Sequence, residues 1–216
     1  MLHNLKIETM IIGKIQFIVF ALTSILCTLT ANDLKATHIA GGEITYKWIS
    51  DSTFEFRVEF YRFCVGSPAQ LPPTANLCFL DGVSGFRTDI FGPNDNTASL
   101  PQISADTLKL GDDCFTPVGL CVQRGIYQDT LTIPTRTTGY ELRYVTCCRN
   151  AGIQNIDDES MTWTAIMPDP ALRNSSPRFK NIPRSYLCLN QLNFEDVSAT
   201  DIDGDSLYYY IMEPQN

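Results

Sequence analysis

The sequence predicts an all-β protein: a disulfide-stapled β-sandwich followed by the beginning of a second β unit. Polar and apolar residues alternate in several short runs, which is the pattern of strands with one buried face. Clusters of Gly, Pro, Asn and Asp separate these runs, and beyond residue 36 no amphipathic pattern exceeds about two helical turns. The 216-residue chain has eight cysteines, and the seven that follow residue 36 are available for disulfide bonds.

Residues 1–36 are predicted to be a secretory signal peptide. Two lysines precede a mostly apolar run at 15–29, and Ala31 or Ala36 offers the small residue of a cleavage site. A membrane span is the alternative, but the run is shorter than the ~20 residues that a bilayer requires. Cys27 lies in the run, and the residues before it do not fit a lipidation site. We therefore expect export, with no transmembrane span once the signal is removed.

The first folded domain, a disulfide-rich β-sandwich, is expected at residues 37–168. Residues 43–49 alternate and residues 50–52 provide a turn, so a hairpin is predicted with the strand that follows. That second strand places one set of apolar side chains on a single face: Phe54, Phe56, Val58 and Phe60. Further short strand patterns lie at residues 77–80, 87–91, 127–133, 140–147 and 161–167. Many short strands broken by turns are typical of a β-sandwich.

A second unit is expected after a Pro- and Ser-rich linker at residues 169–178. Strand patterns resume at residues 179–216, but so short a piece holds two or three strands, too few to bury a sheet face alone. We therefore expect that the sequence is the front of a longer protein, or that this last unit docks on the first domain.

Seven cysteines follow the predicted signal, and their number is odd, which implies a free thiol, an intermolecular bond or a partner beyond the sequence. They are Cys64, Cys78, Cys114, Cys121, Cys147, Cys148 and Cys188. The neighbours Cys147 and Cys148 end a strand pattern, so their side chains point to opposite faces and each needs its own partner. A metal site or a redox dithiol is the alternative, although the chain has no C-x-x-C motif.

The pairing of these cysteines stays open at the level of sequence. Cys114 and Cys121 are close enough along the chain to pair locally. Cys64 with Cys147 or Cys148 would close a much longer loop and contribute roughly 4.5 kcal/mol in the chain-entropy model. If Cys188 has its partner beyond residue 216, the six others belong to the first domain.

Five motifs occur in one order: THIAGGEITY at 37–46, YRFC at 61–64, Gly139-Tyr140 leading to CCRN at 147–150, NSSP at 174–177 and ATDIDGDSL at 199–207. In this the chain resembles the N-terminal region of large surface proteins of gliding, type IX-secreting bacteria, which are similar to PKD-domain and gliding motility-associated adhesins. The resemblance implies tandem β-sandwich modules, with an Ig-like or cadherin-like second unit. It also implies a place in the medium or on the outer face of the outer membrane, and a role in adhesion or surface motility. Cys78 and Phe63 depart from the family pattern.

The acidic run at residues 201–205 is the strongest chemical motif. Asp201, Asp203 and Asp205 place three carboxylates within five residues, and Gly204 permits a tight turn. Hard oxygen ligands suit Ca²⁺, and the spacing is similar to the interdomain calcium loops of cadherin-like repeats rather than to an EF-hand. A linker residue, Asn174 or Asp169, would complete the shell. The alternative is an acidic turn that binds no metal.

The net charge and the scarcity of histidine favour a non-enzymatic binding module. A net charge of −8 argues against nucleic acid as a partner, because a phosphate backbone requires a basic face. His38 is the only histidine beyond the signal, and a hydrolytic triad would depend on it alone. The expected partners are extracellular surfaces, glycans or proteins. A carbohydrate-binding accessory module is the alternative function, with Trp48, Trp163 and Tyr208–Tyr210 able to stack on sugar rings, although core packing is an equally ordinary use of such aromatics.

Overall fold

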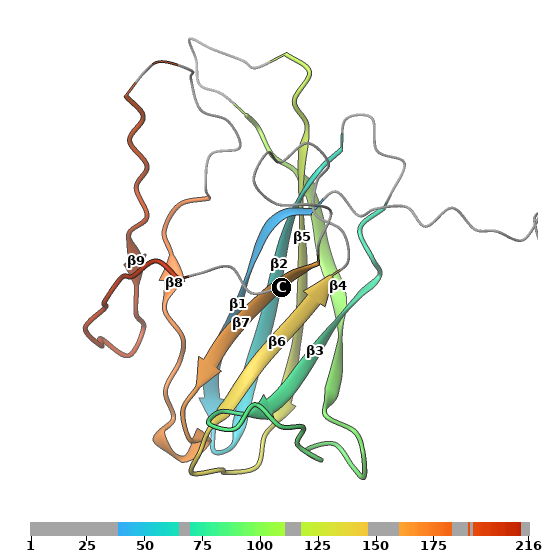
Figure 1. Cartoon of the computed structure of the whole chain (residues 1–216), viewed down its shortest axis with the longest axis vertical. Helices are drawn as coiled ribbons and strands as arrows, with labels where there is room; N and C mark the ends of the chain where they lie inside the picture. The colour runs from blue at the N-terminus through green and yellow to red at the C-terminus, as the bar shows by residue number, and fades with distance from the viewer. Residues whose placement is uncertain are drawn as a thin grey trace, which may run out of the picture. The chain divides into compact units, whose positions relative to one another are not determined.

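The structure is a computed structural model that describes residues 39–64, 70–110, 118–146, 160–182, 190 and 192–212 (Figure 1). These residues belong to one compact unit, Ala36–Asn216. The predicted signal peptide, His38 and four of the cysteines, Cys114, Cys147, Cys148 and Cys188, lie outside the described residues. In the part of the chain that is described, no helix has the length and apolar character needed to cross a membrane.

Seven strands form a single antiparallel sheet in the order β1-β2-β5-β4-β3-β6-β7 (Figure 1). Their bounds are β1 Ile39–Ser50, β2 Thr53–Phe63, β3 Thr74–Asp81, β4 Thr97–Thr107, β5 Val122–Thr132, β6 Tyr140–Thr146 and β7 Met161–Met167. The prediction of an all-β fold is confirmed, as is the hairpin of β1 and β2, whose register pairs Glu43 with Glu59 and Trp48 with Phe54.

The sheet folds back on itself because β4 belongs to both halves. The first part of β4 pairs with β3, up to Pro101, and the second part pairs with β5, beginning at Gln102. A register shift between Gln102 and Ser104 marks a bulge, which bends a strand and increases its twist. The fold brings β1 and β7, the two ends of the strand order, next to each other without a hydrogen-bond ladder. The result is a nearly closed, sandwich-like sheet.

The core lies between the two halves and is rich in aromatic rings. The predicted apolar face of β2 is fully buried: Phe54, Phe56, Val58 and Phe60. The ring of Phe56 meets that of Phe79 edge-on with centroids 5.2 Å apart. All buried hydrophobic side chains of the described residues lie at or before Met167. The core is therefore built by β1 to β7 and by Ile133 in the connection between β5 and β6.

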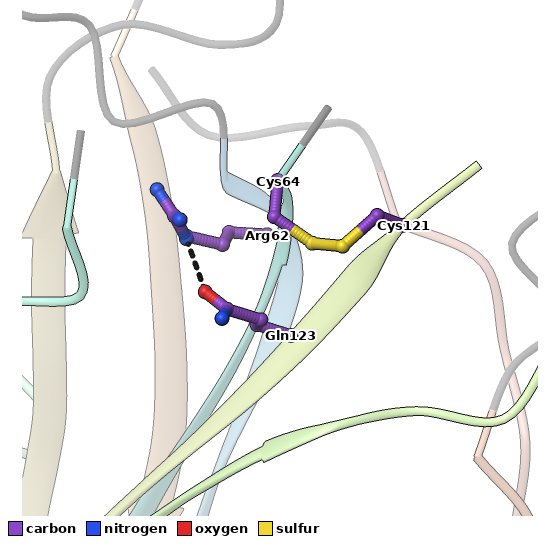
Figure 2. The surroundings of a disulfide bond; sticks show 4 residues. All are labelled: Arg62, Cys64, Cys121 and Gln123. Carbon is purple, nitrogen blue, oxygen red and sulfur yellow. Dashed lines mark hydrogen bonds between the residues drawn. A yellow bond between two sulfur atoms is a disulfide. The ribbon is translucent and has the colours of Figure 1, made fainter. Parts of the chain in front are cut away.

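One disulfide joins the ends of β2 and β5, between Cys64 and Cys121, whose Cα atoms are 5.2 Å apart (Figure 2). This corrects the local pairing of Cys121 with Cys114 and the long-range pairing of Cys64 with Cys147 or Cys148. The reason is the register of the strands: Phe63 lies opposite Val122, so the next residues on each strand also face each other. Closing a loop over a sequence separation of 57 contributes about 4 kcal/mol in the chain-entropy model.

The inclusion of Cys78 among the disulfide-bonded residues is also wrong. Cys78 is a free, half-buried thiol in β3, with its sulfur 3.6 Å from the Thr97 hydroxyl oxygen. β3 lies between β4 and β6 in the strand order, and the residues opposite Cys78 are Thr97 and Arg143, neither of which is a cysteine.

The C-terminal segment, defined here as residues 174–212, follows a short 3-10 helix η1 at Pro170–Leu172 inside the predicted linker. Two short strands pair within the segment, β8 Arg178–Phe179 with β9 Ala199–Thr200. Polar contacts attach it to β1. The Ser176 N–H donates to the Tyr46 carbonyl over 2.9 Å, and the Tyr46 N–H donates to Ser176 Oγ over 2.8 Å. The segment therefore docks on the first domain, which was one of the two expectations for it.

Candidate binding surface

The acidic turn at residues 201–205 is held by one of its own carboxylates. Asp201 Oδ1 accepts hydrogen bonds from the N–H groups of Asp203, at 2.8 Å, and Asp205, at 3.2 Å. Gly204 has φ +83°, a left-handed conformation that glycine adopts without strain, as the sequence predicts for a tight turn. These bonds occupy one oxygen of Asp201 and leave its second carboxylate oxygen available.

A second carboxylate connects this turn to the linker. The Ser175 N–H donates to Asp203 Oδ2 over 2.6 Å, and Ser175 Oγ accepts from the Trp48 N–H over 3.2 Å. Asp203, Ser175 and β1 thus form a continuous chain of hydrogen bonds. The structure brings the predicted site residue Asn174 to the same place, where its amide donates to the Ser175 carbonyl over 3.1 Å.

Tyr46 lies close to the contact between Ser175 and the acidic turn, and the charges of the turn affect its pKa. Burial raises the pKa of the Tyr46 hydroxyl to about 12. A hydrogen bond with the Asn174 side chain lowers that pKa, and the nearby carboxylates of Asp201 and Asp203 raise it further. The hydroxyl donates to the Ile166 carbonyl of β7 over 3.2 Å. Tyr46 therefore stays neutral and links β1, β7 and the acidic turn.

The predicted calcium residues are brought together only in part. Asp201, Asp203 and Asn174 gather around Ser175 and Tyr46, but no set of three Asp, Glu, His or Cys side chains in the described residues is arranged to hold a metal ion. Two of the carboxylate oxygens already accept backbone hydrogen bonds. The calcium site remains a prediction.

A groove runs along the junction of β1 and β7, and sequence reasoning did not find it. It has two adjoining parts, of about 510 and 380 Å³, which share Gly42, Glu43, Trp163 and Phe179 in their walls. Tyr208 and Tyr209 line the larger part, and Ala40 and Asn181 line the smaller one. The larger volume falls within the range of ordinary ligand sites. The groove forms where the edges of β1 and β7 meet in the folded protein, so no local sequence pattern can predict it.

The aromatic residues proposed for sugar stacking have different surroundings. Trp163 packs its ring on Phe60 and Tyr144, with centroids 5.4 and 5.6 Å away, and its remaining surface lines the groove. Trp48 carries the Arg173 guanidinium over its ring at 5.6 Å. Tyr208 and Tyr210 are exposed, and their rings stack at 6.1 Å with an interplanar angle of 27°.

Two carboxylates lie beside the groove, Glu43 and Glu59, and Glu59 makes a second contact with the C-terminal segment through Arg178. Glu43 and Glu59 lie opposite each other on the outer face of the hairpin. Glu59 is buried and bonded to Arg57 at 2.6 Å, with the Arg178 guanidinium at 3.8 Å. Burial, and then the charge of Glu59, raise the pKa of the Glu43 carboxyl. A pocket of about 270 Å³ adjoins this cluster, with Arg57 and Arg178 in its wall.

The sequence did not indicate several of these site residues, among them Ser175, Ser176 and Glu59. The NSSP motif was the available signal, because serines ahead of a proline often accept or donate backbone hydrogen bonds in place of a ladder. Glu59 carried no signal, since it occupies an ordinary polar position of an alternating strand. Comparison with protein-family models, with curated proteins and with solved structures finds no match for this chain.

Proposed function

We propose that this chain is a non-enzymatic module of a secreted or cell-surface protein, and that it contributes to adhesion or surface motility. The observation that carries the proposal is the docking of the acidic turn and the NSSP linker onto β1, through Asp203, Ser175 and Ser176. This contact attaches the C-terminal segment to β1 at one place, and a ligand bound there would stiffen the attachment. Extended adhesins need such stiff joints between modules.

The disulfide supports an exported location. Cys64 and Cys121 bond across adjacent strands, and such bonds persist in oxidising compartments outside the cytosol. The acidic composition, with a net charge of −8, suits an exposed soluble surface. A motility or adhesion role rests further on the resemblance carried by the five motifs.

An adhesion assay tests this proposal. Cells or beads that display the chain should attach to a host or conspecific surface more strongly than those displaying the Asp203→Ala variant, in which the joint is released. A matched control is Asp106→Ala, which removes an exposed carboxylate of β4. Two strands separate β4 from β1, where the C-terminal segment is attached. Equal attachment by all three, at the level of beads without protein, would contradict an adhesive role.

Calcium at the acidic turn is part of the proposal. Asp201, Asp203, Asp205 and Asn174 are the residues that would hold the ion, and bound Ca²⁺ would stiffen the joint. We expect Ca²⁺ to raise the melting temperature of the wild type, and Asp205→Asn to remove the rise. Asp205 is chosen because no bond found among the described residues involves its carboxylate, so the substitution leaves the turn itself intact. An unchanged wild-type melting temperature at millimolar Ca²⁺ would refute the calcium site while leaving adhesion open.

Carbohydrate binding is the second candidate, and the stacked pair Tyr208 and Tyr210 beside the groove favours it. Exposed aromatic faces are the usual platforms for sugar rings, and the threonines of β7 line the same groove. We expect glycan-array signals that Tyr208→Ala abolishes and that Phe86→Ala, at an exposed aromatic of the β3–β4 connection, leaves unchanged. Glycan binding that both Tyr208→Ala and Phe86→Ala retain would exclude Tyr208 as a sugar-stacking residue.

A further inference from the structure

The outward edge of β1 carries backbone groups that the sheet does not use. The Tyr46 N–H and C=O turn away from β2 and meet Ser176. In an antiparallel pair this direction repeats at every second residue, so Ile44 and Gly42 turn theirs the same way. Among the described residues neither has a hydrogen-bond partner on that side. A sheet edge with free donors and acceptors is a template for another strand.

The C-terminal segment begins to pair with this edge and then leaves it. Ser176 makes its hydrogen bonds with Tyr46, but Arg178, the next residue whose main chain would face β1, does not continue the ladder. Arg178 and Phe179 pair with β9 instead of with β1. The groove opens where the two separate, and the interface of Ser175 and Ser176 with β1 thus continues as an unfilled edge.

The edge is accessible to an approaching backbone. The groove exposes the β1 edge, since Gly42 and Ile44 line its larger part. On the sheet face, a Cβ atom built on Gly41 meets no atom within 4 Å, whereas one built on Gly42 would meet Phe60 and Trp163 at 3.2 Å. The two parts of the groove flank β1 from Ala40 to Tyr46. That stretch is about 20 Å long, enough for a strand of six residues.

The same chain carries a run that fits this edge. Residues 207–212, LYYYIM, are uncharged and apolar, and they belong to no strand of the structure. Tyr208 is 86% and Ile211 101% exposed. The described residues of the groove wall are also mostly uncharged, with Glu43 as the one carboxylate among them. An exposed edge and an exposed strand-like run on one molecule are the two halves of a head-to-tail contact.

We propose that the edge of β1 at Gly42 and Ile44 takes residues 207–212 of a second copy of this chain as an added β-strand. The added strand runs antiparallel to β1, in line with the pairing that Ser176 begins. The donor run and the β1 edge are different segments, although Leu207, Tyr208 and Tyr209 of the same copy also line the groove. Each copy can therefore both give and receive a strand, and the product is a chain of copies. Self-assembly of this kind is independent of any adhesion ligand.

Sedimentation of the purified protein over a range of concentrations tests the proposal. We expect wild type to associate, and Gly41→Lys to be about tenfold weaker because a charged edge residue disfavours strand addition. Gly41→Ala, which fits the same open space, should associate as wild type does. Tyr208→Ser with Ile211→Ser should also weaken association, whereas Val83→Ser with Phe86→Ser, which removes comparable exposed apolar surface elsewhere, should not.

A labelled synthetic peptide of residues 203–212 distinguishes main-chain hydrogen bonding from non-specific hydrophobic association. N-methylation of alternate residues removes the N–H groups on one side of a strand only. We expect one alternate set of methyl groups to weaken binding about tenfold and the other set to leave it intact. Equal binding by both methylated peptides, or a wild type that stays monomeric at millimolar concentration, would overturn the proposal.

Discussion

The sheet of β1 to β7 and the C-terminal segment of residues 174–212 are stabilised by different interactions. The sheet, together with the connections between its strands, holds every buried hydrophobic side chain of the described residues and the one disulfide seen among them. The segment is attached by serine hydroxyls, one carboxylate and a distant ion pair, and its apolar side chains face solvent. Apolar burial contributes far more free energy than exposed polar contacts do. The sheet should therefore fold cooperatively, and the segment should open at a much smaller free energy.

The largest expected effect is at the centre of the sheet. Phe56→Ala removes a fully buried ring that contacts Phe79, and we expect the free energy of unfolding to fall by about 3–5 kcal/mol. Phe86→Ala, at an exposed ring, should change it by less than about 0.5 kcal/mol. Urea denaturation of the three proteins provides the measurement. A small loss for Phe56→Ala would mean that the two halves of the sheet do not share one core.

The disulfide should rank next. Replacing Cys64 and Cys121 together by serine is expected to lower the free energy of unfolding by about 2–4 kcal/mol, because the unfolded chain regains the freedom that the bond removes. Denaturation under identical buffer conditions measures the change. Cys78→Ser is the matched control, since Cys78 is free, and it should behave like the wild type. A stability loss at Cys78 equal to that of the double variant would contradict the assigned pairing.

Within the sheet, the pH should act in opposite ways on two carboxylates, Asp81 of β3 and Glu43 of β1. Hydrogen bonds from Thr138 and Ser84 hold the pKa of Asp81 well below its ordinary 3.8, so its contribution is present above that pH and is lost as the pH falls further. The pKa of Glu43 is raised from 4.5 by burial, so stability is lost as the pH rises through the folded value.

Melting temperature as a function of pH checks both signs. Asp81→Asn should flatten the acid limb of the wild-type curve, and Glu43→Gln should make the protein more stable at neutral pH relative to wild type. Both substitutions remove one negative charge, so opposite changes in melting temperature cannot come from net charge alone. An unchanged acid limb in Asp81→Asn would contradict a lowered Asp81 pKa in the folded protein.

The smallest effect on global stability is expected at the joint. Asp203→Ala removes the acceptor for the Ser175 N–H and should leave the free energy of unfolding of the sheet within about 1 kcal/mol of wild type. Limited proteolysis should nevertheless cleave residues 178–212 faster, because their attachment is weakened. The exposed Asp106→Ala substitution serves as the control. Unaltered cleavage in Asp203→Ala would place the attachment elsewhere in the segment.

The sequence was most informative where the pattern is local. The buried face of β2 follows from alternation alone, and the tight turn at Gly204 follows from its residue type. The bond between Cys64 and Cys121 depends on the register of β2 and β5, which are separated by two other strands in the chain, so spacing favoured the wrong partners. The groove beside Gly42 depends on β1 meeting β7, the most distant pair of the sheet. Non-local pairing of this kind leaves no periodic trace in the sequence.

Native-state hydrogen exchange tests the difference between the two regions most directly. Amides in the central strands β2 and β5 should exchange only through global unfolding, whereas the Lys180 N–H, bonded to the Ser198 carbonyl beside β8 and β9, should exchange through a local opening of much lower free energy. Adding denaturant should accelerate the first set and leave the second almost unchanged. Equal protection of Lys180 and β5, with the same denaturant dependence, would contradict the separation of a cooperative sheet from a weakly held segment.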